Sequence, residues 1–249
     1  MRRAIALIDR SDVVLFCGSY IVLVVVWYGL GRAIMASDVI MRADYNAVQW
    51  LVRRRTPRLD YLTELGSSMS STGIKILVTA VLAAVVFAVW RRWREPMVIV
   101  LSLLLEAMAF ITVTYLVARP RPDVARLEGS SVDSSFPSGH AAAAVVYSAV
   151  LIVVFWHTRK WWVRIIAGIV TLSVAVIVAV SRVYRGMHYL TDVIAGCLLG
   201  AASVVCCWWL IDRVLRRTED SHSGRGDTVA ESLGDLDLSH PQPGLQATS

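Results

Sequence analysis

Six long runs of apolar residues, separated by short polar segments, dominate the chain. They cover residues 13–30, 76–90, 96–118, 141–156, 165–181 and 193–211. With one or two flanking residues, each run approaches the roughly 17–25 residues that a helix needs to cross about 30 Å of hydrocarbon. Because lipid offers the backbone no hydrogen-bond partners, uninterrupted runs of this length indicate helices. The pattern therefore predicts an all-α protein, a six-transmembrane-helix bundle.

Another segment, residues 38–55, has the spacing of an amphipathic helix. Its apolar side chains fall on one helical face, at Val39, Ile40, Ala43, Ala47, Val48, Leu51 and Val52. Three arginines, at 53–55, follow this face. The segment is expected to form an interfacial helix between the first two spans. An ordinary helix packed on the bundle has the same pattern, and the sequence does not separate the two.

Composition supports a membrane protein and separates a tail from it. The 249 residues are 56% hydrophobic and 18% charged, whereas soluble domains average about 45–50% and about 25%. Residues 218–249 hold no aromatic side chain and carry six acids against one base, which predicts a disordered acidic tail after a membrane-embedded domain of residues 1–217. The net charge of +6 does not indicate nucleic-acid binding, because the arginines cluster at the ends of apolar runs.

An even number of spans places both termini on one side of the membrane, together with the loops 91–95 and 157–164. This side carries 13 of the 25 Lys and Arg residues, so the count alone does not orient the chain. However, every segment on this side has at least three bases close to a span end. Basic residues favour the cytoplasmic side. We therefore expect cytoplasmic termini in a bacterial inner (plasma) membrane.

Polar clusters lie at the span ends that face away from the termini. They are residues 119–122 after the third span, 137–140 before the fourth, 181–182 at the end of the fifth, and His188 with Asp192 at the start of the sixth. Alternating helices bring these ends to one face of the membrane, which the orientation above makes the extracytoplasmic face.

Several residues in these clusters are suited to binding phosphate. Ser138 can cap the helix that follows it, and Gly139 lets backbone N–H groups approach an anion at that helix N-terminus. Arg121 and Arg182 can each donate two charge-assisted hydrogen bonds to phosphate oxygens. The clusters therefore predict an anion site.

Two histidines on the same face can supply the chemistry. His188 and Asp192 are spaced i, i+4, so the carboxylate can accept a hydrogen bond from one ring nitrogen and leave the other as nucleophile or base. His140 is then available to protonate a leaving oxygen.

The clusters resemble the type 2 phosphatidic acid phosphatase (PAP2, lipid phosphate phosphatase) superfamily, which shares its catalytic core with vanadium haloperoxidases. The family pattern is K-x6-RP, then PSGH, then SR-x5-H-x3-D. Residues 137–140 read PSGH, and residues 181–192 keep the spacing of the third motif. The first motif is incomplete, because Thr114 stands seven residues before Arg121, where the family pattern has Lys.

The resemblance implies a role for each matching residue. It implies that His188 attacks phosphorus to form a phosphohistidine, that Asp192 orients His188, and that His140 protonates the leaving group. It also implies that no metal or other cofactor is needed and that phosphate is held by Arg121, Arg182, Ser138 and the Gly139 amide. Because Thr114 leaves one cation fewer for a phosphate of about −1.5 to −2 charges, we hypothesise that Arg119 or Arg185 supplies it.

The function implied is that of an integral membrane lipid phosphatase acting on a lipid phosphomonoester or diphosphate. Polyprenyl diphosphate, phosphatidic acid and phosphatidylglycerol phosphate are the candidate substrates. Thr114 motivates an alternative, a catalytically weakened relative that binds or moves lipid. A haloperoxidase does not require six spans, and a transporter gives no reason for the histidine and arginine spacing.

Three further acids fall outside the motifs. Glu106 lies within the third span, where an ionisable group is either functional or paired within the bundle, and the sequence leaves both open. Asp123 and Asp133 lack a ligand cluster and are expected to belong to a loop rather than to a metal site.

Overall fold

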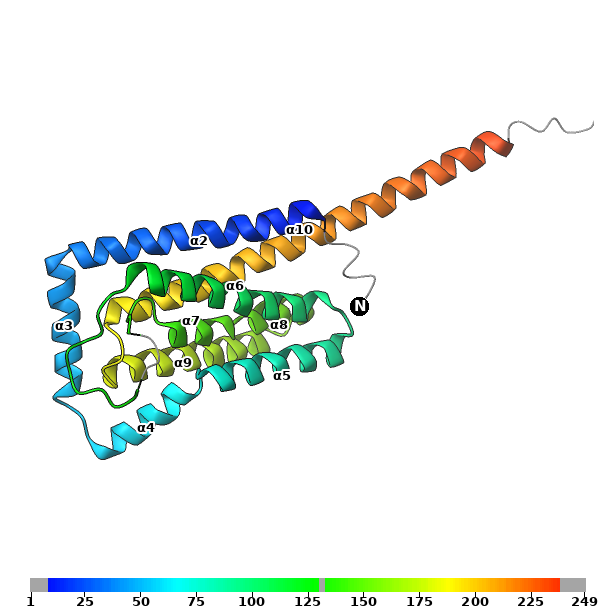
Figure 1. Ribbon diagram of the computed structural model, residues 1–249. Coiled ribbons are helices and arrows are strands. Elements are labelled where there is room, and N and C mark those ends of the chain that lie inside the picture. The colour runs from blue at the N-terminus through cyan, green and yellow to red at the C-terminus, as the bar shows by residue number, and fades with distance from the viewer. Residues whose placement is uncertain (1–8, 130–132, 238–249) are drawn as a thin grey trace, which may run out of the picture.

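A computed structural model describes residues 9–129 and 133–237, with side chains up to residue 217. These residues form nine helices, and they run in the order α2 (Arg10–Ala36), α3 (Asp38–Val52), α4 (Pro57–Ser68), α5 (Thr72–Trp90), α6 (Arg94–Val117), α7 (Gly139–Val146), α8 (Ala149–His157), α9 (Trp161–Tyr184) and α10 (Leu190–Asp237). Figure 1 shows the long helices side by side, with α3 and α4 at one end of the bundle.

Six helical segments are long and apolar enough to cross a membrane, which confirms the predicted architecture. They are Arg10–Ala36, Thr72–Trp90, Arg94–Val117, Gly139–His157, Trp161–Tyr184 and Leu190–Arg217. The fourth segment is two helices, α7 and α8, because the helix is interrupted at Tyr147 and Ser148. The protein is therefore an integral membrane protein with an all-α fold.

The spans differ in how deeply they are buried within the protein. Half of the most apolar window of α10 lies buried, and the same share of α7 with α8, whereas the corresponding windows of α2 and α5 are only 11% buried. The outer helices instead expose large aliphatic side chains, as expected for surfaces in contact with lipid. α6, α7 and α10 therefore form the centre of the bundle.

Small residues let α10 approach α7 closely. A Cβ atom built on Gly196 would lie 2.3 Å from the carbonyl oxygen of Ser138, and one on Gly200 would lie 2.3 Å from that of Ala142. Since no side chain fits in this space, the glycines serve a helix contact within the bundle. This contact fixes the start of α7 against the start of α10, and both helix starts carry predicted site residues.

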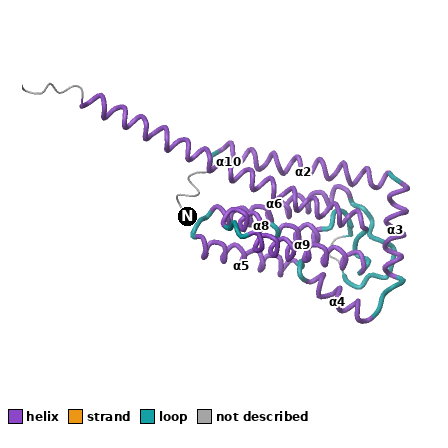
Figure 2. The backbone as a smooth tube through the Cα atoms, turned by 180° about the vertical axis from the view of Figure 1, so that it is seen from behind, coloured by secondary structure: helices purple, strands orange, loops and turns teal. Residues whose placement is uncertain are grey.

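The amphipathic segment forms α3, which lies across the end of the bundle (Figures 1 and 2). It contacts α2, α9 and α10, and it buries Val48 completely. The helix thus packs on the end of the bundle, and its position at the membrane interface stays a prediction. Asp44, only 3% exposed, is also turned inward from this helix.

The sequence interpretation missed α4. Thr56 caps this helix by accepting a hydrogen bond from the Leu59 N–H at 3.3 Å, and Pro57 occupies its first position. Threonine followed by proline is a recognised helix start. The segment has low hydrophobicity, and therefore no apolar run drew attention to it.

The end of the chain departs from the predicted tail. α10 continues as a helix to Asp237, so residues 218–237 are helical rather than disordered, while residues 238–249 lie outside the described part. A helix that is already nucleated gains one hydrogen bond for each residue added, and no proline interrupts the chain before Pro241.

Arg217 contacts Asp12 of α2 at 3.2 Å, so α2 begins beside α10 at the end of the bundle opposite to α3.

Candidate active site

The predicted site residues meet at the end of the bundle covered by α3 and α4. They come from the segment after α6, the start of α7, the end of α9 and the turn before α10. His188 lies within the electrostatic reach of Arg182, Arg121 and His140. Four of the residues singled out by motif are thus brought together from positions far apart in the chain.

His188 is held in one tautomer by a backbone carbonyl. Its Nδ1 lies 2.6 Å from the carbonyl oxygen of Ser135, and the ring is only 4% exposed. A carbonyl oxygen can only accept, so Nδ1 carries the hydrogen and donates it, which leaves Nε2 with a lone pair. Burial lowers the pKa of His188 well below its ordinary 6.5, and the positive charges of Arg182 and Arg121 lower it further. The ring is therefore neutral and nucleophilic at Nε2.

The predicted contact between His188 and Asp192 is wrong. No hydrogen bond or ion pair joins them, because His188 lies in the turn before α10 and the i, i+4 spacing does not put both residues on one helical face. Asp192 is the third residue of α10 and accepts from the Tyr189 N–H at 2.8 Å, as the acid of a capping box does. It thereby fixes the residue next to His188, and its own carbonyl accepts from the Ser138 N–H at 2.9 Å.

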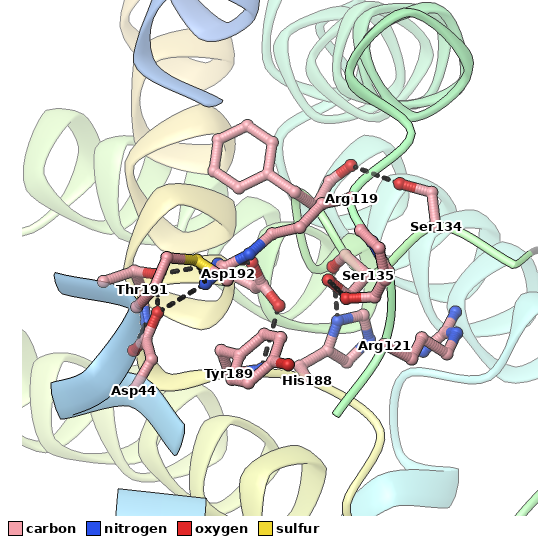
Figure 3. A network of polar contacts seen from close by, with 12 residues as sticks. Asp44, Arg119, Arg121, Ser134, Ser135, His188, Tyr189, Thr191 and Asp192 are labelled. Carbon is pink, nitrogen blue, oxygen red and sulfur yellow. Dashed lines mark hydrogen bonds and ion pairs between the residues drawn. The ribbon is translucent and has the colours of Figure 1, made fainter. Parts of the chain in front are cut away.

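Arg119 is not available to bind phosphate, which corrects the first half of our hypothesis on the missing cation. Its guanidinium is completely buried between the carboxylates of Asp44 and Asp192 and lies 4.2 Å from the centre of the Tyr189 ring (Figure 3). It donates to Asp44 Oδ2 at 2.8 Å and to Thr191 Oγ1 at 2.9 Å. Arg119 therefore holds the start of α10 instead of contacting a substrate.

Asp44 is a member of this network that sequence reasoning did not identify. In addition to Arg119, it accepts hydrogen bonds from the Thr191 N–H at 3.1 Å and from the Thr191 hydroxyl. It lies four residues before Val48 and four after Ile40, so an acid stands within the apolar face of α3. This acid within an apolar face could have identified Asp44 from the sequence, because a carboxylate on a buried face requires a partner.

Arg121 borders the nucleophile. One of its terminal nitrogens donates to the carbonyl oxygen of Met187 at 2.5 Å, directly before His188. Burial lowers the pKa of Arg121 to about 10, helped by the neighbouring positive charges of Arg182 and Arg126. Arg121 therefore remains charged at neutral pH, close enough to Arg182 for the two charges to interact.

Arg182 and Arg185 share a carboxylate from the loop between α6 and α7. Arg182 donates to Glu128 Oε2 at 2.6 Å and to the Ser67 hydroxyl oxygen at 2.8 Å, and Arg185 Nε lies 2.5 Å from Glu128 Oε1. Both arginine side chains are almost fully buried. The Nε of Arg182 is buried without an acceptor among the described residues. Arg185 also donates to two backbone carbonyls, of Asp60 and of Leu127.

The start of α7 is built as its motif predicts, although its glycine has a further reason. Ser138 is the N-cap and accepts from the Ala141 N–H at 3.5 Å. A Cβ on Gly139 would lie 2.9 Å from the Phe110 ring, so α6 requires a glycine here. His140 follows, and its ring makes no hydrogen bond within the described residues.

Two polar residues of α6 are buried without partners. Thr114, at the position of the family lysine, is 2% exposed and its hydroxyl has no hydrogen-bond partner in the described structure. Glu106 is fully buried, and neither carboxylate oxygen has a hydrogen-bond partner there. Eight residues of helix, about 12 Å, separate them. Glu106 therefore lies deeper in the bundle than the site.

Among the described residues, no group of three or more His, Cys, Asp or Glu could hold a metal ion.

Comparison with known proteins confirms the resemblance seen in the motifs. Residues 95–216 match the PAP2 superfamily. The phosphatidylglycerophosphatase B of Bacillus subtilis (strain 168) is 43% identical over 90 residues, which are 34% of this chain and 42% of that protein. A putative undecaprenyl-diphosphatase of Escherichia coli (strain K12) is 33% identical over 134 residues, 51% of this chain and 64% of that protein. The matches thus span less than two thirds of these relatives.

The fold is shared with a solved membrane structure. The crystal structure of a transmembrane PAP2 type phosphatidylglycerolphosphate phosphatase from Bacillus subtilis superposes with a TM-score of 0.66. The superposition covers 80% of this chain and 96% of that chain, at 23% sequence identity.

Proposed function

Because residues 95–216 match the PAP2 superfamily, we propose that the protein is a membrane lipid phosphatase, which removes phosphate from a lipid phosphomonoester or a lipid diphosphate. The observation that carries this proposal is His188, whose Nδ1 is committed to the Ser135 carbonyl while Nε2 is free beside two arginines. A neutral imidazole with one fixed nitrogen is a suitable nucleophile toward phosphorus.

The first half of the reaction transfers phosphate to the protein. His188 Nε2 attacks phosphorus, a P–N bond forms, and the bond from phosphorus to the leaving oxygen breaks. His140 gives its proton to that oxygen, so that a phosphomonoester releases a lipid alcohol and a diphosphate releases a lipid monophosphate. Asp192 acts as a positioning residue, since it holds the turn that carries His188.

The second half releases the phosphate. His140, now neutral, accepts a proton from a water molecule, whose oxygen attacks phosphorus while the P–N bond to His188 breaks. Inorganic phosphate leaves and both histidines return to their starting states. Because nucleophile, acid and cations are all side chains, we expect turnover to persist in the presence of a chelator.

Arginines would hold the transferring group. The buried Nε of Arg182 has no acceptor in the described structure, and a phosphate oxygen would satisfy it. Arg121 adds a second positive charge beside His188. Ser138 and the free N–H groups at the start of α7 would bind a further oxygen.

The substrate class is tested by a phosphate-release screen. The purified protein is given phosphatidylglycerol phosphate, phosphatidic acid and a polyprenyl mono- or diphosphate in detergent. We expect release from at least one, and loss of at least about 1,000-fold in kcat for His188→Ala, because the nucleophile is removed. His222→Ala, in the C-terminal segment beyond the spans, is the matched control and should match wild type. Equal rates for wild type and His188→Ala would refute the proposal.

The orientation is part of the proposal. Both termini would lie in the cytoplasm of a bacterial cell, and the active site would face the extracytoplasmic side of the plasma membrane. The basic residues near every span end on the terminal side support this orientation. Reporter fusions after Arg217 and within the loop 122–129 test it, because only the loop fusion should activate a reporter that requires export.

Thr114 favours a second candidate, a relative that binds lipid phosphate without turning it over. The family lysine is absent, and Arg119 cannot replace it because two carboxylates already hold it. Rapid quenching separates the two functions. A phosphohistidine on His188 that forms and decays during turnover supports the phosphatase, whereas lipid binding without phosphohistidine supports the alternative.

A further inference from the structure

Glu128 occupies the place where an anion would be expected in this site. Its two carboxylate oxygens are divided between two arginines: Oε2 lies 2.6 Å from Arg182 and Oε1 lies 2.5 Å from Arg185. Glu128 comes from the loop between α6 and α7, whereas Arg182 lies in the last turn of α9 and Arg185 is the C-cap of that helix. The Glu128 carboxylate thus reaches the two arginines from a different segment of the chain and lies against the end of α9, which carries Arg182.

A carboxylate and a phosphate bind to a guanidinium group in the same way. Each offers oxygens that accept charge-assisted hydrogen bonds from arginine in a planar fork. The same terminal nitrogen of Arg182 that bonds Glu128 also donates to Ser67 at 2.8 Å, so this nitrogen is fully engaged. A substrate phosphate that binds this nitrogen of Arg182, in addition to the unpartnered Nε, has to displace Glu128.

Burial distinguishes this contact from an ordinary surface ion pair. The side chains of Arg182 and Arg185 are 4% and 5% exposed, whereas that of Glu128 is 25% exposed. Two buried cations side by side need a negative counter-charge, and leaving them without one is costly. Glu128 supplies that charge from the solvent-facing side, where a flexible side chain can rotate away.

We propose that Glu128 is an internal substitute for phosphate, which occupies the arginine subsite in the substrate-free protein and is displaced when a lipid phosphate binds. The inference rests on the proposed function, because that function makes Arg182 a phosphate ligand. Competition with the Glu128 carboxylate weakens the binding of any phosphate group at this arginine subsite. A lipid substrate offsets this through contacts of its lipid portion, whereas inorganic phosphate does not, so Glu128 favours release of the product.

Equilibrium binding of inorganic phosphate tests the proposal without turnover. Full-length wild type, Glu128→Gln and Glu128→Ala are titrated with phosphate in detergent by calorimetry, after their melting temperatures show that they are folded. We expect Kd to fall at least about ten-fold in both variants, equivalent to about 1.4 kcal/mol. Asp123→Asn is the matched control, because Asp123 is an exposed carboxylate of the same loop without an ion pair to a described residue. Its Kd should equal that of wild type.

The opposite result has a clear meaning. If Glu128 only holds the arginines in position, both variants will bind phosphate more weakly than wild type, and the proposal is overturned. It is also overturned if Kd stays within two-fold of wild type, or if no protein binds phosphate. Infrared difference spectra of the wild type give a second measurement, because phosphate should shift the stretching band of a carboxylate that loses its arginine partners. An unshifted band on phosphate binding contradicts the proposal.

These outcomes are separate from those of the function itself. A wild type that releases phosphate from no lipid refutes the proposed function, whatever the titrations show. A wild type that releases phosphate while Glu128→Gln shows unchanged phosphate binding refutes only the role of Glu128. In the expected case, Glu128→Gln also lowers KM for the lipid substrate and makes inorganic phosphate a stronger inhibitor.

Discussion

Replacing Asp44 with alanine tests whether α3 is part of the machinery that positions the site. The carboxylate of Asp44 is 3% exposed and accepts three hydrogen bonds, one from Arg119 and two from Thr191. At about 1.5–3 kcal/mol for each bond to a charged group, the gross loss is about 4.5–9 kcal/mol. Several kcal/mol are recovered, because the variant no longer buries that carboxylate.

The expected net loss of folding free energy is therefore about 2–4 kcal/mol. Unfolding of the purified protein in SDS, followed by circular dichroism, measures it. Asp38→Ala provides the control, because Asp38 is an exposed acid in the first turn of the same helix, where an acid contributes about 0.3–1 kcal/mol. We also expect kcat to fall at least about ten-fold in Asp44→Ala, since Thr191 lies in the first turn of α10, three residues after His188.

A double-mutant cycle that combines Asp44→Ala with Arg119→Ala measures the interaction between these two side chains directly. Because the two side chains contact each other at 2.8 Å, their effects should not add, and a coupling energy of about 0.5–3 kcal/mol is expected. Substitutions at unimportant surface positions change the free energy of unfolding by less than about 0.5 kcal/mol. If the free energy of unfolding of Asp44→Ala differs from that of the wild type by no more than this, the account of this network is wrong.

Three further changes probe other parts of the structure. Burial lowers the pKa of the nucleophile His188 well below 6.5, so the acid limb of kcat/KM, corrected for titration of the substrate, should be centred below pH 6.5. An acid limb centred above pH 6.5 would contradict the assignment. Gly196→Ala should cost about 1–3 kcal/mol in SDS unfolding because its Cβ would meet the Ser138 carbonyl, whereas Gly168→Ala, with open space around it, should be neutral or stabilising. Thr114→Val removes a buried hydroxyl that has no partner, so its stability in the same assay should equal or exceed that of wild type, and a loss above about 1 kcal/mol would reveal a missed hydrogen bond.

The arrangement of the site explains why local spacing misled the prediction for Asp192. The i, i+4 rule holds within a helix, but α10 begins at Leu190, two residues after His188. The orienting acceptor is instead the carbonyl of Ser135, a backbone atom from another segment. No pattern of side chains in the sequence marks such an atom, because every residue has a carbonyl.

The arginines show the same limit from another direction. Arg119 and Arg121 stand two residues apart and look equally suited to phosphate in the sequence. Their roles differ because Asp44, 75 positions before Arg119, lies against one of them and not the other. The hypothesis for Arg185 remains a prediction, since Glu128 now lies against that side chain.

The sequence by itself determined the membrane spans, the face on which the polar clusters gather and the residue types of the site. These follow from local physics: a run of apolar residues has to avoid water, a helix has a fixed rise, and alternating spans return to the same side. Only the tertiary structure decided which arginine is held by the Asp44 and Asp192 carboxylates, which atom fixes the His188 tautomer and which carboxylate faces Arg182 and Arg185. Those outcomes depend on contacts between segments far apart in the chain, where burial makes each unpaired charge costly and so selects one partner among several.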